Sequence, residues 1–262
     1  MRTPVFQTLI LVFILVMNSC SSGQDRTMQT GGLNIKEQEK GKVIPNVVCI
    51  KDQATSYTLY LPRNYSREKK SPVILIFDPH GSGFLPVEKY KNLAEQYGYI
   101  LIGSNNSRNG LQMNETENII FSLFEEIDLR YSIDTSRIYA MGFSGGARIA
   151  SLIALYRGGI KGVIGCGAGF PATGQPGRFR FDYIGFAGNA DFNMNELINL
   201  DSELEKSGLR HATKIFDGKH EWPPVDIIEL AFLWNECCAM RDGKITKKQE
   251  YLNRVKEILN KS

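Results

Sequence analysis

Short, continuously apolar runs alternate with longer helical patterns through most of the chain, and this alternation limits the folds that it can adopt. Residues 73–77 and 99–102 are apolar throughout, which is typical of strands buried on both faces of a parallel sheet. Parallel neighbours are joined by crossovers of a dozen or more residues, usually helices. We therefore predict a three-layer α/β domain with a mostly parallel central sheet.

The expected elements follow one another from about residue 45. Residues 47–50 and 57–61 alternate like an antiparallel pair and open the sheet. The further expected strands are 73–77, 99–102, 137–143, 162–166, 183–187 and 213–216. The expected helices are 87–97, 115–130, 147–156, 195–207 and 225–240, with a last amphipathic helix at 246–258. We assign the domain to residues 45–243 and the C-terminal helix to 244–262.

The composition fits one domain and excludes several classes of protein. The chain has 262 residues, 42% of them hydrophobic, with 31 basic and 28 acidic side chains. That balance excludes a disordered chain and a disulfide-dense miniprotein. We expect no nucleic-acid partner, because the net charge of +3 is spread along the chain. The oligomeric state is not set by these features.

The first twenty residues differ from the rest. Residues 5–17 are apolar except for Gln7 and Thr8 and follow Arg2, as in a signal peptide. The run is shorter than the roughly 20 residues of a membrane span. It ends in Ser19-Cys20, which resembles a bacterial lipobox. We expect a signal peptide at 1–19, a lipid on Cys20 and a flexible tether at 20–44, with simple secretion as the alternative.

This segment sets the expected location. The mature chain would be exported and held on a bacterial cell membrane, on its periplasmic or cell-surface face, through the lipid alone. The remaining cysteines lack the spacing of a zinc site, so no metal is expected. We expect these cysteines to be buried free thiols, and one or two disulfides are the alternative. They are Cys49, Cys166, Cys237 and Cys238.

A G-x-S-x-G motif at 142–146 lies directly between a predicted strand and a predicted helix. A turn that tight has no room for large side chains beside the serine, so Gly142 and Gly146 are required sterically. The hydroxyl of Ser144 then projects from a strained turn. We predict that Ser144 is a nucleophile.

A serine nucleophile needs a base and a group that orients the base. His220 lies past the end of the last predicted strand, at the sheet edge where sites form. Asp191 follows the preceding strand, so the chain order is Ser144, Asp191, His220. Asp217 is the fallback acid, and Asp182 precedes its strand, at the wrong edge.

A glycine-rich loop follows the buried strand 73–77 and predicts an oxyanion hole. We expect the backbone amides of Ser82 and Gly145 to stabilise a developing negative charge, with Gly81 and Gly83 shaping the loop. Trp222 is a candidate substrate contact, and core packing is its alternative role. Residues 165–180 form a candidate wall over the pocket, and the chain has no room for a lid domain.

These features together resemble the α/β-hydrolase superfamily. The resemblance covers about residues 46–240 and is carried by SYTLYLP at 56–62, the loop at 80–83, the Ser144 turn, Asp191 and HEWPP at 220–224. Within the superfamily the chain looks most like the secreted group that contains feruloyl esterases and polyhydroxybutyrate depolymerases. The resemblance implies a serine ester hydrolase.

The expected chemistry is acyl transfer to water through an acyl-enzyme on Ser144, without a cofactor. The expected substrate is a small-molecule, carbohydrate or polymer ester, such as an acetyl or feruloyl ester of carbohydrate. Two alternatives remain open. One is a serine peptidase of the prolyl oligopeptidase type, and the other is an inactive, lipid-anchored glycan-binding protein.

Overall fold

The computed structural model describes residues 38–170, 180–246 and 248–259. The predicted signal peptide, Cys20 and the tether up to residue 37 lie outside the described residues, as does most of the candidate wall at 165–180. Contacts divide the chain into two units, Met1–Lys36 and Glu37–Ser262, and the second contains every element described below.

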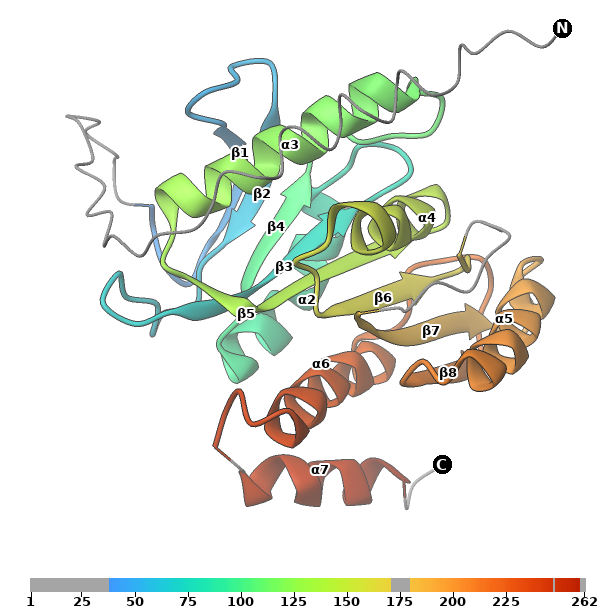
Figure 1. The fold of residues 1–262 in the computed structure, drawn as a ribbon. Helices are drawn as coiled ribbons and strands as arrows, with labels where there is room; N and C mark the ends of the chain where they lie inside the picture. Colours follow the sequence, from blue (N-terminus) through green and yellow to red (C-terminus); the bar gives the residue numbers. More distant parts are fainter. Residues whose placement is uncertain (1–37, 171–179, 247, 260–262) are drawn as a thin grey trace, which may run out of the picture. The chain divides into compact units, whose positions relative to one another are not determined.

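Eight strands form one sheet in the order β1-β2-β4-β3-β5-β6-β7-β8 (Figure 1). Strands β1 and β2 are antiparallel to their neighbours, and all pairs from β4 to β8 are parallel. The predicted fold class, with its antiparallel opening pair, is confirmed. The strands are β1 Val43–Val48, β2 Ser56–Tyr60, β3 Ser71–Phe77, β4 Ile100–Ser104, β5 Ile133–Phe143, β6 Gly162–Cys166, β7 Asp182–Gly188 and β8 His211–Phe216.

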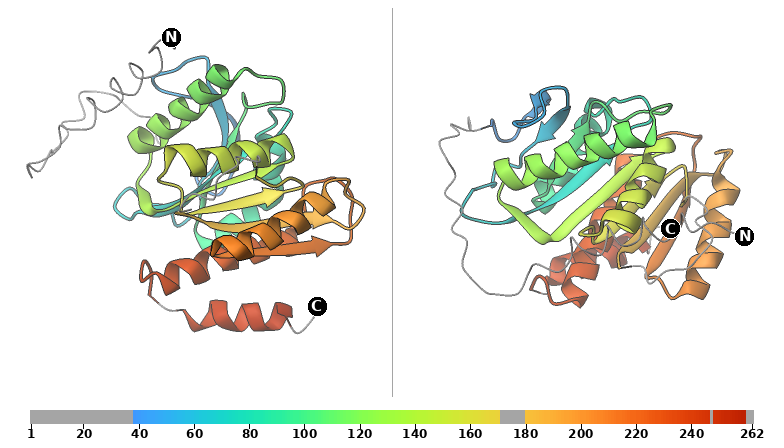
Figure 2. Two further views of the ribbon diagram at one scale, coloured as in Figure 1. Left: turned by 45° about the vertical axis from the view of Figure 1, so that its right-hand side comes forward. Right: turned by 45° about the horizontal axis from the view of Figure 1, so that its top comes forward.

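Helices cover both faces of the sheet and bury it in two apolar cores (Figure 2). Side chains of α3, α4 and α5 join one core, and those of α2, α6 and α7 join the other. The helices are α2 Phe84–Tyr97, α3 Met113–Arg130, α4 Gly145–Leu152, α5 Met194–Ser207, α6 Val225–Arg241 and α7 Gln249–Leu259. Within the described ranges, the residues of both cores lie from Val43 onward, and a chain that begins at Ser21 keeps all of them.

Several element boundaries differ from the sequence prediction. Helix α2 begins at Phe84 instead of residue 87, because Pro86 is tolerated in a first turn, where its missing N–H has no intrahelical acceptor. Strand β5 begins at Ile133 instead of residue 137. After the buried Ile133, its residues 134–136 are polar and partly or fully exposed, so they carry no apolar pattern. Helix α4 ends at Leu152 and continues as a π-helix over Ile153–Arg157, for which the local sequence offers no physical reason.

The four described cysteines are free thiols, in agreement with the preferred expectation. Cys49, Cys166 and Cys238 are buried, and burial raises the pKa of the Cys49 thiol to about 12. Within the described residues, no helix is both long and apolar enough to cross a membrane.

The C-terminal helix α7 is held by one partly buried ion pair. Arg254 of α7 donates to both carboxylate oxygens of Glu229 on α6, at 2.9 and 2.7 Å. Tyr251 of the same helix is buried against Tyr97, with ring centroids 5.5 Å apart. The Arg254 guanidinium holds the pKa of Glu229 below its ordinary value of 4.5.

We expect Arg254→Ala to lower the free energy of unfolding at pH 7 by about 1 kcal/mol, because Glu229 loses its cationic partner while solvent screens the half-exposed arginine. The folded-state pKa of Glu229 is depressed, so this contribution is present above pH 4.5 and is lost as the pH falls through the folded pKa. Urea unfolding at pH 7 and at about pH 3 measures both effects. Lys256→Ala, on the exposed side of α7, is the control and should change neither value.

Candidate active site

The loops that carry the predicted site residues all leave one edge of the sheet. Parallel register aligns Phe77 with Gly142, Phe143 with Cys166, and Gly188 with Phe216, so β3, β5, β7 and β8 end side by side. The loops after these strands bear Asp78, Ser144, Asp191 and His220. This is the carboxyl edge, where sites form in open α/β sheets.

Ser144 occupies a strained turn between β5 and α4. Its φ of 52° is the only positive φ of a non-glycine residue in the described ranges. A Cβ atom on Gly142 would lie 2.1 Å from the carbonyl oxygen of Gly146, and one on Gly146 would lie 2.0 Å from that of Phe77. Backbone strain of this kind is concentrated at functional sites, and here the close packing of the two glycines imposes it.

A chain of two hydrogen bonds links the three residues predicted as catalytic. The Ser144 Oγ lies 3.0 Å from His220 Nε2, and His220 Nδ1 lies 2.9 Å from Asp191 Oδ1. The tautomer with its proton on Nδ1 satisfies both contacts, because Nδ1 then donates to the carboxylate and Nε2 accepts from the hydroxyl. Asp191 is almost fully buried, with 1% of its side chain exposed.

The other two carboxylates considered from the sequence lie elsewhere. Asp217 accepts a hydrogen bond from Asn189 Nδ2 at 3.1 Å. Asp182 pairs with Arg210 at the amino edge of the sheet. The contact with His220 therefore favours Asp191.

Asn193 supports the acid and the base, and the sequence reasoning missed it. Its backbone N–H donates to Asp191 Oδ1 at 2.7 Å, and its side-chain Nδ2 donates to the Gly167 carbonyl at 2.8 Å. Gly167 has a φ of +64°, and a Cβ atom there would lie 3.2 Å from His220 Cε1. The backbone at Gly167 thus packs closely against the imidazole.

Trp222 lies in the core, which corrects its prediction as a substrate contact. It is 6% exposed, and its ring packs against Phe143, with centroids 5.5 Å apart. Its indole N–H donates to Asp78 Oδ2 at 2.8 Å, while Asp78 Oδ1 accepts from the backbone of His80 at 2.8 Å. The buried carboxylate of Asp78 therefore joins the loop after β3 to the loop that carries His220. No role for Asp78 was predicted from the sequence.

An exposed aromatic side chain lies where Trp222 was expected. Phe192 is 77% exposed, and its ring centroid lies 4.2 Å from that of His220. Phe143 contacts the same imidazole at 4.6 Å. The signal that could have identified Phe192 is its position directly after Asp191 in the sequence.

The predicted oxyanion donors lie in the two expected loops. Gly145 is the first residue of α4, where a backbone N–H has no intrahelical acceptor. A Cβ atom on Gly145 would lie 1.9 Å from Asn109 Oδ1, so this carboxamide, also missed, covers the start of the helix. Ser82 precedes Gly83, where an added Cβ atom would lie 2.2 Å from the Gly103 carbonyl oxygen, so the two backbones pack closely there. The oxyanion role of Ser82 and Gly145 stays a prediction.

Comparison with known proteins shows likeness in structure alone. No family model matches the chain, and no curated protein matches its sequence. S-formylglutathione hydrolase FrmB from Staphylococcus aureus superposes with a TM-score of 0.60 at 13% identity, over 74% of this chain and 97% of its own. A ferulic acid esterase gives 0.58 at 15% identity, over 75% and 98%.

A third solved structure has the same architecture. The carboxylesterase EstE1 from a metagenomic library superposes with a TM-score of 0.61 at 11% identity, over 78% of this chain and 91% of its own. The sheet order, the Ser144 turn and these superpositions agree. The chain has the α/β-hydrolase fold.

Proposed function

We propose that the chain is a serine hydrolase that cleaves carboxylic esters. The observation that carries the proposal is the hydrogen-bonded series Ser144, His220, Asp191 at the carboxyl edge of the sheet. The structural neighbours include an S-formylglutathione hydrolase, a ferulic acid esterase and a carboxylesterase, which supports ester chemistry over other uses of the fold.

Each residue has a defined part in the reaction. His220 accepts the Ser144 proton as the hydroxyl oxygen attacks the ester carbonyl, and Asp191 holds the imidazole in the tautomer that can accept it. The amides of Gly145 and Ser82 stabilise the oxyanion. His220 then protonates the leaving alcohol, and water releases the acyl group from Ser144.

The proposed substrates are exposed esters, such as acetyl or feruloyl groups on carbohydrate. Phe192 supports this choice, because an exposed aromatic ring beside the base offers a stacking surface for an aryl acyl group or a sugar. We also propose that the chain is exported and held on a bacterial membrane by a lipid on Cys20.

Hydrolysis by the full chain tests the proposed activity. We expect turnover of 4-nitrophenyl acetate and of cinnamate-type aryl esters, with little or no cleavage of the matching anilides and of peptides. A fluorophosphonate probe should attach to one residue, and peptide mass analysis should identify it as Ser144. A folded protein that hydrolyses no ester and leaves Ser144 unlabelled would exclude the proposal.

The contact between Phe192 and His220 predicts a role in substrate preference. Phe192→Ala should raise the KM for cinnamate-type esters about five-fold, because a stacking contact contributes about 1 kcal/mol. The KM for acetyl esters should change less than two-fold, since an acetyl group has no ring to stack. Steady-state kinetics on both ester types measures the difference. Equal changes for the two would assign Phe192 to the support of His220 instead of the substrate.

A further inference from the structure

The edge of the sheet opposite Ser144 carries a concentration of basic side chains. A basic residue directly precedes three of the parallel strands: Lys70 before β3, Lys161 before β6 and Arg210 before β8. Arg180 lies two residues before β7. Because these strands are parallel, the residues before them gather at the amino edge.

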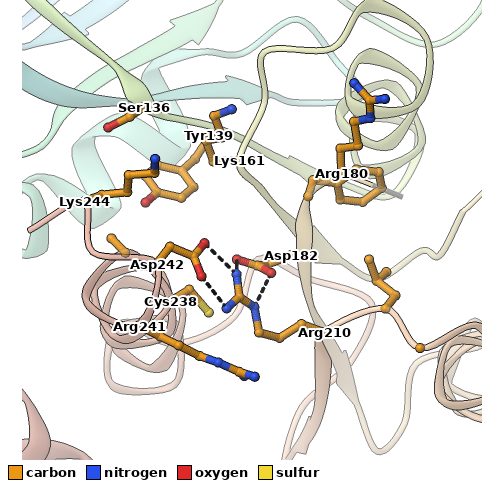
Figure 3. A pocket seen from close by; sticks show the side chains of 14 residues that line it. Ser136, Tyr139, Lys161, Arg180, Asp182, Arg210, Cys238, Arg241, Asp242 and Lys244 are labelled. Atoms are coloured by element: carbon orange, nitrogen blue, oxygen red, sulfur yellow. Dashed lines mark hydrogen bonds and ion pairs between the residues drawn. The ribbon is translucent and has the colours of Figure 1, made fainter. Parts of the chain in front are cut away.

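Two cavities are lined by this set. The first has a volume of about 460 Å³ and is shown in Figure 3. Arg210 pairs there with both acidic lining residues, Asp182 and Asp242, at 2.5 and 2.9 Å. The other basic side chains at this cavity are exposed to solvent: Lys161, Arg180, Arg241 and Lys244.

The second cavity, of about 700 Å³, lies beside the first and shares Lys244 with it. It adds one acidic residue, Glu236, and four basic ones, Lys69, Lys70, Arg137 and Lys248. The two cavities together are lined by nine basic and three acidic residues, whereas the whole chain has 31 and 28. The residues that line these two cavities therefore carry an excess of six positive charges, and the rest of the chain is acidic on balance.

Helix dipoles do not explain this excess. Arg241 is the last residue of α6 and complements the partial negative charge of its C-terminus. Lys70 and Lys161 lie in loops before strands, where no such helix end requires them. A site for one small anion does not explain it either, because Arg180 and Arg241 lie on opposite sides of the Arg210 cluster and Arg180 points away from it (Figure 3). Basic side chains that point in different directions cannot all contact one small ion, but they can contact an extended anionic surface.

The chain enters the domain at this same edge. Val43 pairs with Tyr60, and Tyr60 pairs with Leu101, near the start of β4, so β1 begins level with the starts of the parallel strands. Cys20 precedes Gln38, the first described residue, by 18 positions. Even a fully extended segment of that length spans only about 63 Å. A lipid on Cys20 would thus keep the basic end within reach of the bilayer.

We propose that the basic end of the domain docks on the anionic lipid headgroups of the membrane that holds Cys20. The choice of a membrane as the partner rests on the lipid anchor in the proposed function. Docking in this way directs the edge with Ser144 away from the bilayer, toward substrates in solution or on neighbouring polymers.

Vesicle binding by the unlipidated chain from Ser21, which keeps both cores, tests the docking without the anchor. We expect cosedimentation with vesicles of phosphatidylcholine containing about 30% phosphatidylglycerol, little with phosphatidylcholine alone, and release at about 0.5 M salt. Replacing Lys161, Arg241 and Lys244 together by alanine should lower the partition coefficient about ten-fold or more.

A charge-matched variant separates position from net charge. Lys51, Lys91 and Arg108 line neither cavity, and their joint replacement by alanine should change binding less than two-fold. Equal losses in the two variants, or no binding to anionic vesicles, would overturn the docking. A third outcome would assign the cavities to a small anion instead: inorganic phosphate raises the melting temperature of the parent, and only the variant that lacks Lys161, Arg241 and Lys244 loses this effect. Ester hydrolysis by the same preparations reports on the proposed function separately.

Discussion

Replacing Ser144 by alanine should lower kcat/KM for 4-nitrophenyl acetate by about a thousand-fold or more. The alanine removes the nucleophilic hydroxyl, while the Asp191 to His220 hydrogen bond and the fold remain. His220→Ala should cost about as much, because the hydroxyl then has no base. The double variant should be no slower than either single one, since the residues act as a unit.

Ser151→Ala is the matched control for this prediction. Ser151 lies on α4, seven residues after Ser144, and its buried hydroxyl donates to the Ala147 carbonyl of the same helix, at 3.0 Å. Its loss should leave kcat/KM within about two-fold, because a side-chain bond back to the helix backbone adds little. Parent and variants should match in circular dichroism and urea midpoint. Full activity in folded Ser144→Ala would remove the basis of the proposed function.

Much of the site could be predicted because its parts are encoded locally. The glycines at 142 and 146, the strand before Ser144 and the helix after it occupy one short stretch, so their geometry follows from sequence order. Asp191 and His220 each follow a strand of the same parallel sheet, which places both at the edge of Ser144. The strand at 162–166 was predicted with both boundaries correct, because an apolar strand buried on both faces has abrupt ends.

The features that were missed depend on side-chain direction or on distant partners. Whether Trp222 faces solvent or core depends on the Asp78 carboxylate, 144 positions earlier in the chain. Phe192 and Asn193 directly follow Asp191 in the sequence, but their contacts with His220 and Asp191 are what give them a role.

The basic end illustrates the same limit of sequence reasoning. Its residues are dispersed from Lys69 to Lys248, so the net charge of +3 gives no sign of them. The repeated placement of Lys or Arg just before a parallel strand is the pattern that could have indicated it.

Gly146→Ala should destabilise the domain far more than Gly145→Ala, the substitution of the glycine beside it in α4. The new Cβ atom would lie 2.0 Å from the Phe77 carbonyl oxygen and 2.6 Å from its carbon, and both belong to the backbone of a central strand. The strand cannot move without breaking its pairing on both sides, so we expect a loss of about 3 kcal/mol or more in urea unfolding. Activity should fall with it, because the clash displaces Ser144.

The neighbouring glycine provides the contrast. At Gly145 the added Cβ atom meets the side chain of Asn109, 1.9 Å away, and that exposed side chain can rotate. We therefore expect Gly145→Ala to lower the free energy of unfolding by less than about 1 kcal/mol, since alanine also favours the helix. Adding Asn109→Ala should remove the remaining loss. If Gly146→Ala were as stable as Gly145→Ala, the close approach of α4 to β3 would not explain the glycine at 146, and the strain at Ser144 would need another source.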